Sequence, residues 1–251
     1  MATLVKKRSA RTRMKKRIPR MRTLWDSDGN RLLVIPPEAH TYRGFLKWVM
    51  SDSFPENVPV TYCAGTVGLD MGEENLDSQN AVKTAVYGTL FPLVRRTDFG
   101  ELYTEGALLC NESADISTNP DGAVARWETI EKKKVTFIVR KGSRRAIEGT
   151  PDWVMEVISD SSVGKDLRRL RMAYHTAGIG ECWLIDARGD ELSFQILERQ
   201  STDFVAVPSK GGWTYSEVFD REFRLTRVRN RIGGWSNTLE VRRMNGKSRS
   251  R

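Results

Sequence analysis

The stretch PDWVMEVISDSS, residues 151–162, is an apolar run with one acid inside it. Trp153 to Ile158 has the length and the apolar content of a buried strand, and Glu156 stands in its middle. A charged carboxylate inside an apolar strand is costly unless it is paired, hydrogen-bonded or bound to a metal ion. The partner of Glu156 therefore bears on both the fold and the function.

The residues after this strand predict a helix and two more strands. Residues 163–177 carry apolar side chains at intervals of three and four, namely Val163, Leu167, Leu170, Tyr174 and Ala177. A pair of serines before this segment and Gly178 after it are suitable cap and stop residues. Strand-like runs follow at Cys182–Ile185 and Leu192–Leu197. This order predicts an α/β (α+β) protein in which a right-handed crossover joins two parallel strands.

Further elements are predicted on both sides of this unit. Helices are expected over Thr41–Met50 and over Gln79–Leu93, the second capped by Asp77 or Ser78 and ended by Pro92. Residues 127–150 are expected to form an inserted hairpin or loop around the apolar run Val135–Val139. Other strand-like runs are Leu32–Ile35, Gly100–Thr104, Ala107–Cys110, Gly122–Arg126, Phe204–Val207 and Phe223–Val228.

Charge is distributed unevenly along the 251 residues. Residues 1–22 contain ten Lys or Arg and no acid, and residues 221–251 contain ten Lys or Arg and two acids, which leaves 21 basic and 30 acidic residues between them. We expect a disordered basic arm over 1–23, a domain over 24–235 with its core at 75–225, and a basic tail over 236–251. The arm either solubilises the chain or contacts nucleic acid, and in the second case through Lys6, Lys7, Arg8, Lys15, Lys16 and Arg17.

Several classes of site and location are disfavoured by the sequence. The three cysteines form no C-x-x-C pair, and the two histidines are too few for a site built from several imidazoles. No Gly-rich phosphate-binding motif and no G-x-S-x-G motif occurs. No apolar run approaches the roughly 20 residues that a membrane-spanning helix needs. We expect a cytoplasmic protein with no membrane partner.

The partner of Glu156 must come from another part of the chain. Asp152 lies four residues away on the same strand, which at about 3.3 Å per residue is about 13 Å, too far to share one ion. Asp121, in TNPDGAVAR, precedes another predicted strand and would converge on Glu156 if the two strands paired. The alternative is a salt bridge from Glu156 to an arginine of the following helix, with Asp152 as a turn or structural residue.

Three stretches resemble those of one protein family: NPDGAVA at 119–125, PDWVMEVIS at 151–159 and KDLRRLRMAYHTAGIGECWLIDARG at 165–189. In this order and at these spacings they are similar to the large bacterial family of restriction-endonuclease-like proteins within the PD-(D/E)XK nuclease superfamily. The resemblance covers about Asn75 to Leu225. It implies a mixed central sheet flanked by helices and a DNA endonuclease that depends on Mg²⁺ or Mn²⁺, with Asp121 and Glu156 holding the metal.

The chain departs from the family pattern at the catalytic lysine. Ile158 occupies the lysine position of the superfamily's Glu-x-Lys motif, and Leu170 occupies the position where many family members carry a lysine on the next helix. Lys165 is then the candidate that orients the attacking water. Glu74 is a candidate additional acid, or else a charge that favours a helix N-terminus.

Two functions from different classes stay open. One is the metal-dependent endonuclease, which could act as a homodimer. The other is a catalytically degenerate module of the same fold that binds nucleic acid through its basic ends.

Overall fold

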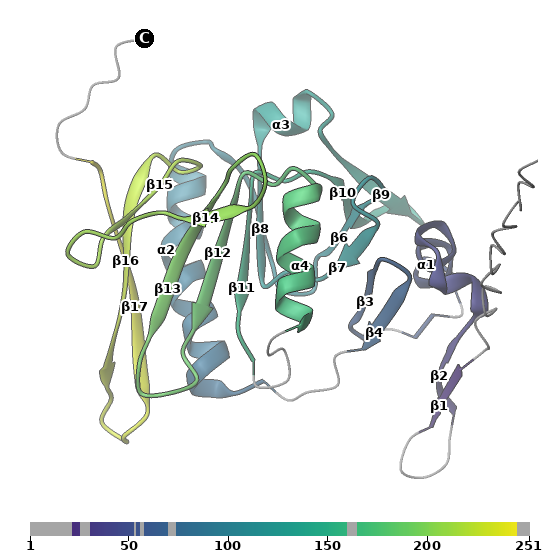
Figure 1. Cartoon of the computed structure of the whole chain (residues 1–251), viewed down its shortest axis with the longest axis horizontal. Coiled ribbons are helices and arrows are strands. Elements are labelled where there is room, and N and C mark those ends of the chain that lie inside the picture. Colours follow the sequence, from purple (N-terminus) through teal and green to yellow (C-terminus); the bar gives the residue numbers. More distant parts are fainter. Residues whose placement is uncertain are drawn as a thin grey trace, which may run out of the picture.

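The computed structural model describes residues 22–25, 31–52, 54–55, 58–69, 74–159 and 165–244. Its centre is a mixed six-stranded sheet in the order β14-β13-β12-β11-β8-β5 (Figure 1). The bounds are β5 Gly100–Thr104, β8 Gly122–Arg126, β11 Trp153–Val157, β12 Glu181–Asp186, β13 Ser193–Arg199 and β14 Phe204–Ala206. β11 and β12 are parallel, and the other neighbouring pairs are antiparallel. The predicted mixed sheet flanked by helices is confirmed.

Alternation along β11 divides the core into two layers. Trp153, Met155 and Val157 face one layer, which also contains the buried stripe of helix α2, Ala81–Arg96. Val154 faces the other layer, together with Tyr174 of helix α4, Lys165–Thr176, and with Ala177, which follows the helix directly. Successive side chains of a strand point to opposite faces, so Glu156 shares the α4 face with Val154. The predicted strand, helix and strand around residues 151–185 are therefore confirmed.

Helix α2 is longer than its sequence pattern predicts. The segment η2, Leu76–Asn80, precedes it, and the side chain of Asn75 caps η2 by accepting from the N–H groups of Asp77 and Ser78. Pro92 lies inside the helix and does not end it. Leu90 and Val94 are buried on either side of the proline, and this packing holds the helix together where the proline removes a backbone donor.

A second six-stranded sheet lies beside the first, in the order β4-β3-β7-β6-β10-β9. Its strands are β3 Val60–Cys63, β4 Thr66–Leu69, β6 Leu108–Asn111, β7 Ile116–Thr118, β9 Val135–Arg140 and β10 Ser143–Gly149. The predicted insertion at 127–150 is a short helix α3, Trp127–Glu131, followed by the β9–β10 hairpin. Beside this sheet lie η1, Pro37–His40, and the predicted helix α1, Tyr42–Val49 (Figure 1).

The two ends of the chain differ from the predicted arm and tail. Residues 22 and 23 begin β1, Arg22–Trp25, which pairs with β2, Arg31–Ile35. Residues 236–242, expected in the basic tail, belong instead to β17, Trp235–Arg242. β17 joins β15, Thr214–Ser216, and β16, Arg221–Arg229, in a three-stranded sheet. Residues 1–21 and 245–251 lie outside the described residues.

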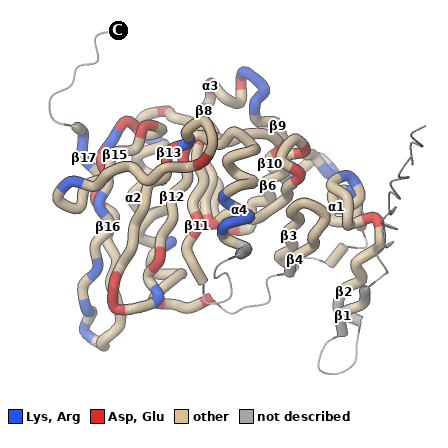
Figure 2. Tube along the Cα trace, viewed as in Figure 1, with Lys and Arg blue, Asp and Glu red and all other residues tan. Residues whose placement is uncertain are grey.

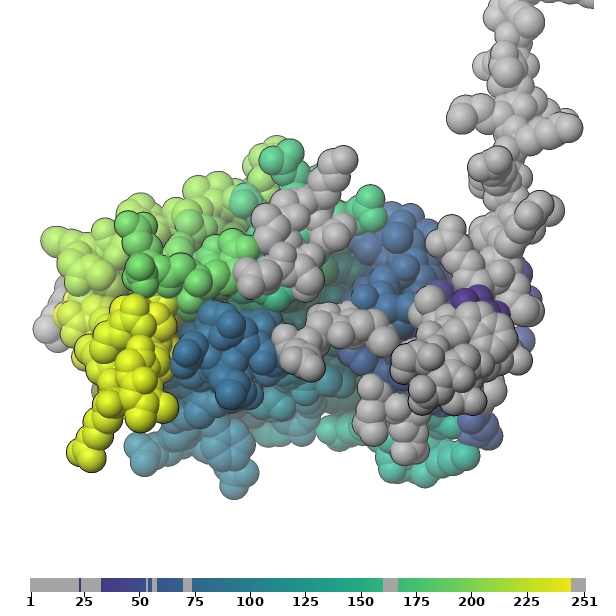
Figure 3. Space-filling view, turned by 90° about the horizontal axis from the view of Figure 1, so that it is seen from below, coloured from purple at the N-terminus to yellow at the C-terminus, as the bar shows by residue number. Residues whose placement is uncertain are grey.

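Only one residue of β17, Leu239, is buried, so the sequence of β17 carries little of the apolar pattern of a core strand. Leu239 is buried against α2, and its carbonyl oxygen accepts a hydrogen bond from Thr89 Oγ1 at 2.8 Å. The space-filling view places this strand directly beside α2 (Figure 3). Its charged residues pair across the strands, Arg242 with Glu222 and Arg224 with Glu240, so the charges lie along β16 and β17 (Figure 2). None of the described helices is both long enough and apolar enough to cross a bilayer.

Candidate metal and catalytic site

Asp121 lies directly before β8, next to Gly122, which pairs with Met155 of β11. Its Oδ2 accepts a hydrogen bond from the backbone N–H of Val157 at 2.7 Å, and its backbone oxygen accepts one from Tyr87 of α2. The next residue is Gly122, where an added Cβ would approach the ring of Trp153 to 3.1 Å. Glycine therefore lets β8 pass under the Trp153 ring while Asp121 turns toward the end of β11.

Glu156 lies next to Asp121 on β11, and its partner is a tyrosine. The Tyr174 hydroxyl of α4 donates a hydrogen bond to Glu156 Oε1 at 2.5 Å. The residue keeps partial surface exposure, but its carboxyl group lies among protein atoms beside a cavity of about 10 Å³, about one water molecule in size. Leu167, Leu170 and Arg171 line this cavity, and the hydrogen bond that helix α4 gives to Glu156 comes from Tyr174 and not from an arginine, which was the alternative partner.

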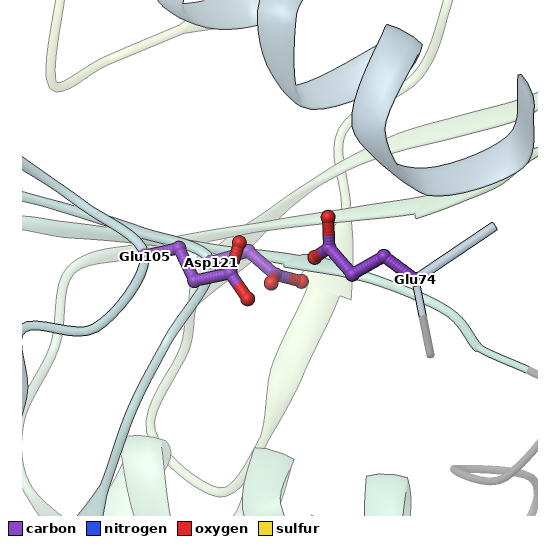
Figure 4. A group of neighbouring side chains, drawn as sticks. All are labelled: Glu74, Glu105 and Asp121. Atoms are coloured by element: carbon purple, nitrogen blue, oxygen red, sulfur yellow. The ribbon is translucent and has the colours of Figure 1, made fainter. Parts of the chain in front are cut away.

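Asp121 also belongs to a group of acids that surrounds one lysine. Oxygens of Glu74, Glu105 and Asp121 all lie within 4.8 Å of one another, and Figure 4 shows the three side chains pointing toward one another. Lys83 Nζ of α2 lies 2.7 Å from Asp121 Oδ1 and 2.9 Å from Glu105 Oε2, and it also contacts Glu74. We call Glu74, Lys83, Glu105 and Asp121 the acid–lysine cluster.

Helix α2 positions this cluster through two side chains one turn apart. Lys83 contributes the ammonium group, and its side chain is only 5% exposed. Tyr87 binds the backbone of two of the three acids: its hydroxyl donates to the Asp121 carbonyl oxygen and accepts from the Glu105 N–H at 3.2 Å. Residues four apart project from the same helix face, so α2 fixes Glu105 and Asp121 relative to Lys83.

The electrostatics of the site follow from burial and crowding. Burial raises the pKa of Asp121 above its ordinary value, against the opposing effect of Lys83. Burial, followed by the Asp121 charge, raises the pKa of Glu156 well above its ordinary range. Burial also raises the pKa of Glu105. Burial on its own would lower the pKa of Lys83, but the neighbouring carboxylates outweigh it and the pKa lies above its ordinary value. Three carboxylates thus surround one ammonium group, and the fourth, Glu156, lies beside Asp121.

This donor set fits a hard divalent cation. Magnesium and manganese bind carboxylate oxygens, and the three acids of the cluster converge closely enough to share one ion. An added cation would also balance the excess negative charge around Lys83. Glu156 is not one of the three acids whose oxygens lie mutually within 4.8 Å; it borders the group through Asp121.

The other predicted site residues lie apart from this cluster or outside the description. Lys165 is the first residue of α4, and its side chain is not among those described, nor are the arm residues from Lys6 to Arg17. Asp152 is structural: it accepts from the Arg126 N–H at 2.8 Å and from Thr129 Oγ1 at 2.9 Å. Arg171 binds Asp203 and the backbone of Phe204.

Sequence reasoning missed Lys83, Glu105 and the role of Tyr174. Lys83 follows Val82 on the buried side of α2, an unusual place for a lysine and the only local signal. Glu105 lies in a turn between two strands and gives no signal of its own. In the sequence, Tyr174 is one member of an apolar helix stripe. Its hydrogen bond to Glu156 is formed only when α4 packs against β11.

Comparison with known proteins agrees with the fold. One solved structure, described as a putative nuclease belonging to DUF820 from Anabaena variabilis, matches with a TM-score of 0.53 and 19% identity, over 71% of this chain and 90% of that one. No curated protein matches. Residues 44–227 match the model of the family named Uma2, described as "Putative restriction endonuclease". This match spans most of the described chain and contains the whole acid–lysine cluster, and the chain therefore belongs to the Uma2 family of restriction-endonuclease-like proteins.

Proposed function

We propose that this protein is an endonuclease that hydrolyses DNA phosphodiester bonds with Mg²⁺ or Mn²⁺. The observation that carries the proposal is the convergence of Glu74, Glu105 and Asp121 within 4.8 Å, beside Glu156, in a nuclease family fold. A divalent ion bound there would supply a Lewis acid for the phosphoryl oxygen and an activated water. Asp121 is the proposed central ligand because it belongs to the cluster and also borders Glu156.

The chain's own residues have separate tasks in this proposal. The Val157 N–H fixes one oxygen of Asp121, so that the other points toward the cluster. Tyr174 orients Glu156, which we propose as the second acid of the metal site. Lys83 places a positive charge at the same end of the strands, where a phosphate bound at the cluster would gain from it. Lys165 stays a second candidate for this cation.

A plasmid-nicking assay tests the proposal. We expect the purified chain to convert supercoiled DNA to the nicked form with Mg²⁺ or Mn²⁺ and to stop when the metal is chelated. Asp121→Asn should abolish nicking, because it removes the charge shared between the cluster and Glu156. Asp190→Asn is the matched control, since Asp190 is exposed and its ion pair is with Arg229, outside the cluster. Nicking by Asp121→Asn at the wild-type rate would contradict the proposal.

A second candidate function is a degenerate module that binds nucleic acid without cutting it. Two observations favour it: Leu170 lines the cavity beside Glu156 where the family helix has a lysine, and Lys83 already occupies the centre of the three acids. DNA binding without nicking under any divalent metal would support this candidate. Deleting residues 1–22 should then weaken binding and lower the salt dependence, with a slope reduced by about 0.9 per lost phosphate contact. An unchanged slope would exclude the arm as the contact.

A further inference from the structure

Lys83 is the one lysine or arginine with a buried side chain in the part of the chain that the structure describes. Lysine is rarely buried unless it is paired, because its ammonium group loses hydration. Three carboxylates replace that hydration here, and each comes from a different segment: Glu74 precedes η2, Glu105 follows β5 and Asp121 precedes β8. Lys83 thus links three parts of the fold through its charge.

The ammonium group lies where the oxygens of the three acids converge. Nζ lies 2.7 Å from the oxygen of Asp121 and 2.9 Å from that of Glu105, and the acid oxygens lie within 4.8 Å of one another. An ion coordinated at about 2.0–2.1 Å by the same oxygens would lie in the space that Nζ fills. The two cations therefore exclude each other from the full set of three acids.

We propose that Lys83 is a tethered competitor for the divalent metal: it neutralises Glu74, Glu105 and Asp121 when no ion is bound, and leaves them when an ion binds. This inference rests on the proposed function, because the ion concerned is the one proposed for the nuclease. It goes beyond the nuclease proposal, because it assigns the control of metal affinity to the side chain of Lys83. The cluster binds metal more weakly than three free carboxylates would, because each binding event must first displace Lys83.

The neighbourhood gives the displaced ammonium group a place to go. Lysine has a flexible four-carbon stem, so Nζ can move while the backbone of α2 stays in place. Glu105 is 49% exposed, so the cluster opens to solvent on that side and the displaced ammonium group can be hydrated there.

Calorimetric titration of Mn²⁺ into metal-free protein tests the competition. Lys83→Met keeps most of the length of the unbranched side chain and removes the charge, and we expect it to bind Mn²⁺ at least about tenfold more tightly than wild type. Lys83→Arg keeps the charge and should bind no more tightly than wild type. Lys132→Met, which removes an exposed lysine paired with Glu128, should leave the affinity unchanged. Equal or weaker Mn²⁺ binding by Lys83→Met would overturn the inference.

Loss of Lys83 leaves uncompensated acids and could prevent folding, so a second pair of variants is needed. Glu105→Gln removes the most exposed acid of the cluster, and the double variant Glu105→Gln with Lys83→Met has one negative charge fewer to compensate. We expect this double variant to bind Mn²⁺ more tightly than Glu105→Gln alone. Binding of equal strength in the two would overturn the inference in the same way.

The outcomes separate this inference from the proposed function. If wild type nicks DNA but removal of Lys83 does not tighten Mn²⁺ binding, the competitor role fails and the nuclease proposal stands. If removal of Lys83 tightens Mn²⁺ binding and no form of the protein nicks DNA, the competitor role stands and the nuclease proposal fails.

Discussion

Glu156 and Glu181 lie on neighbouring strands of the central sheet, β11 and β12, and their surroundings differ. Glu181 is 1% exposed and accepts from uncharged donors, among them Trp183 Nε1 at 2.6 Å, Ser216 Oγ at 2.6 Å and the Val218 N–H at 3.4 Å. Glu156 accepts from Tyr174 and lies beside Asp121, whose charge raises its pKa further. Burial alone therefore does not mark a site; convergence with other acids does.

The largest expected difference between these two glutamates is in catalysis. Glu156→Gln should lower the rate of metal-dependent DNA nicking by roughly three orders of magnitude, because it removes a proposed metal ligand while keeping the shape of the side chain. Glu181→Gln should change the rate little, because Glu181 points into the layer that contains Trp183 and Ser216. Initial rates at saturating Mg²⁺ measure both. A large loss in Glu181→Gln with none in Glu156→Gln would reverse the comparison.

The second difference is in how stability depends on pH. Burial raises the pKa of Glu181 to about 7, from an ordinary value of 4.5, and its hydrogen bonds offset only part of this rise. Between these two values the folded state holds a proton that the unfolded state has released, so the contribution of Glu181 to stability falls as the pH rises from 4.5 to 7. The full change is roughly 3 kcal/mol.

Urea unfolding at several pH values checks this expectation. Glu181→Gln cannot ionise, so its free energy of unfolding should fall less than that of wild type over the same pH range. The variant also tests whether neutral Glu181 is sufficient for the hydrogen bonds to Trp183 and Ser216. Parallel pH profiles for the two proteins would show that Glu181 does not titrate in this range.

The smallest expected effect concerns Tyr174, the donor to Glu156 among the described residues. Tyr174→Phe removes the hydroxyl that binds Glu156 Oε1, which should cost about 1–2 kcal/mol of stability and slow nicking about tenfold. The hydrogen bond lowers the pKa of Glu156, so its loss should also move the acidic limb of the rate profile to higher pH. Tyr62→Phe is the matched control: it loses a hydrogen bond to Asp115 and should destabilise the fold without slowing nicking. Equal rates for wild type and Tyr174→Phe would leave Tyr174 with a packing role alone.

Much of the fold could be predicted because its signals are local. The alternation in Trp153–Val157 and the helical stripe that ends at Tyr174 and Ala177 are written in consecutive residues, and both elements appear as predicted. The predicted end of α2 at Pro92 was wrong because packing on both sides of the proline holds the helix together. β17 was missed because Leu239 alone among its residues is buried, so its sequence carries little of the apolar pattern of a core strand.

The candidate site could be predicted only where strand pairing gives the contact. Asp121 and Glu156 were expected to meet because their strands were expected to pair, and β8 and β11 do pair. Lys83 and Glu105 meet across 22 residues, and Lys83 and Asp121 come from a helix and a turn in different parts of the chain. No local pattern records such a contact. It appears only when α2 packs against the sheet.

The most direct test of the central claim is a calorimetric titration of Mn²⁺ into three metal-free proteins: wild type, Asp121→Asn and Glu181→Gln. We expect wild type and Glu181→Gln to bind the ion with similar affinity and Asp121→Asn not to bind it measurably. Binding by Asp121→Asn with wild-type affinity would contradict the claim that the converging acids at the ends of β8 and β11 form the metal site.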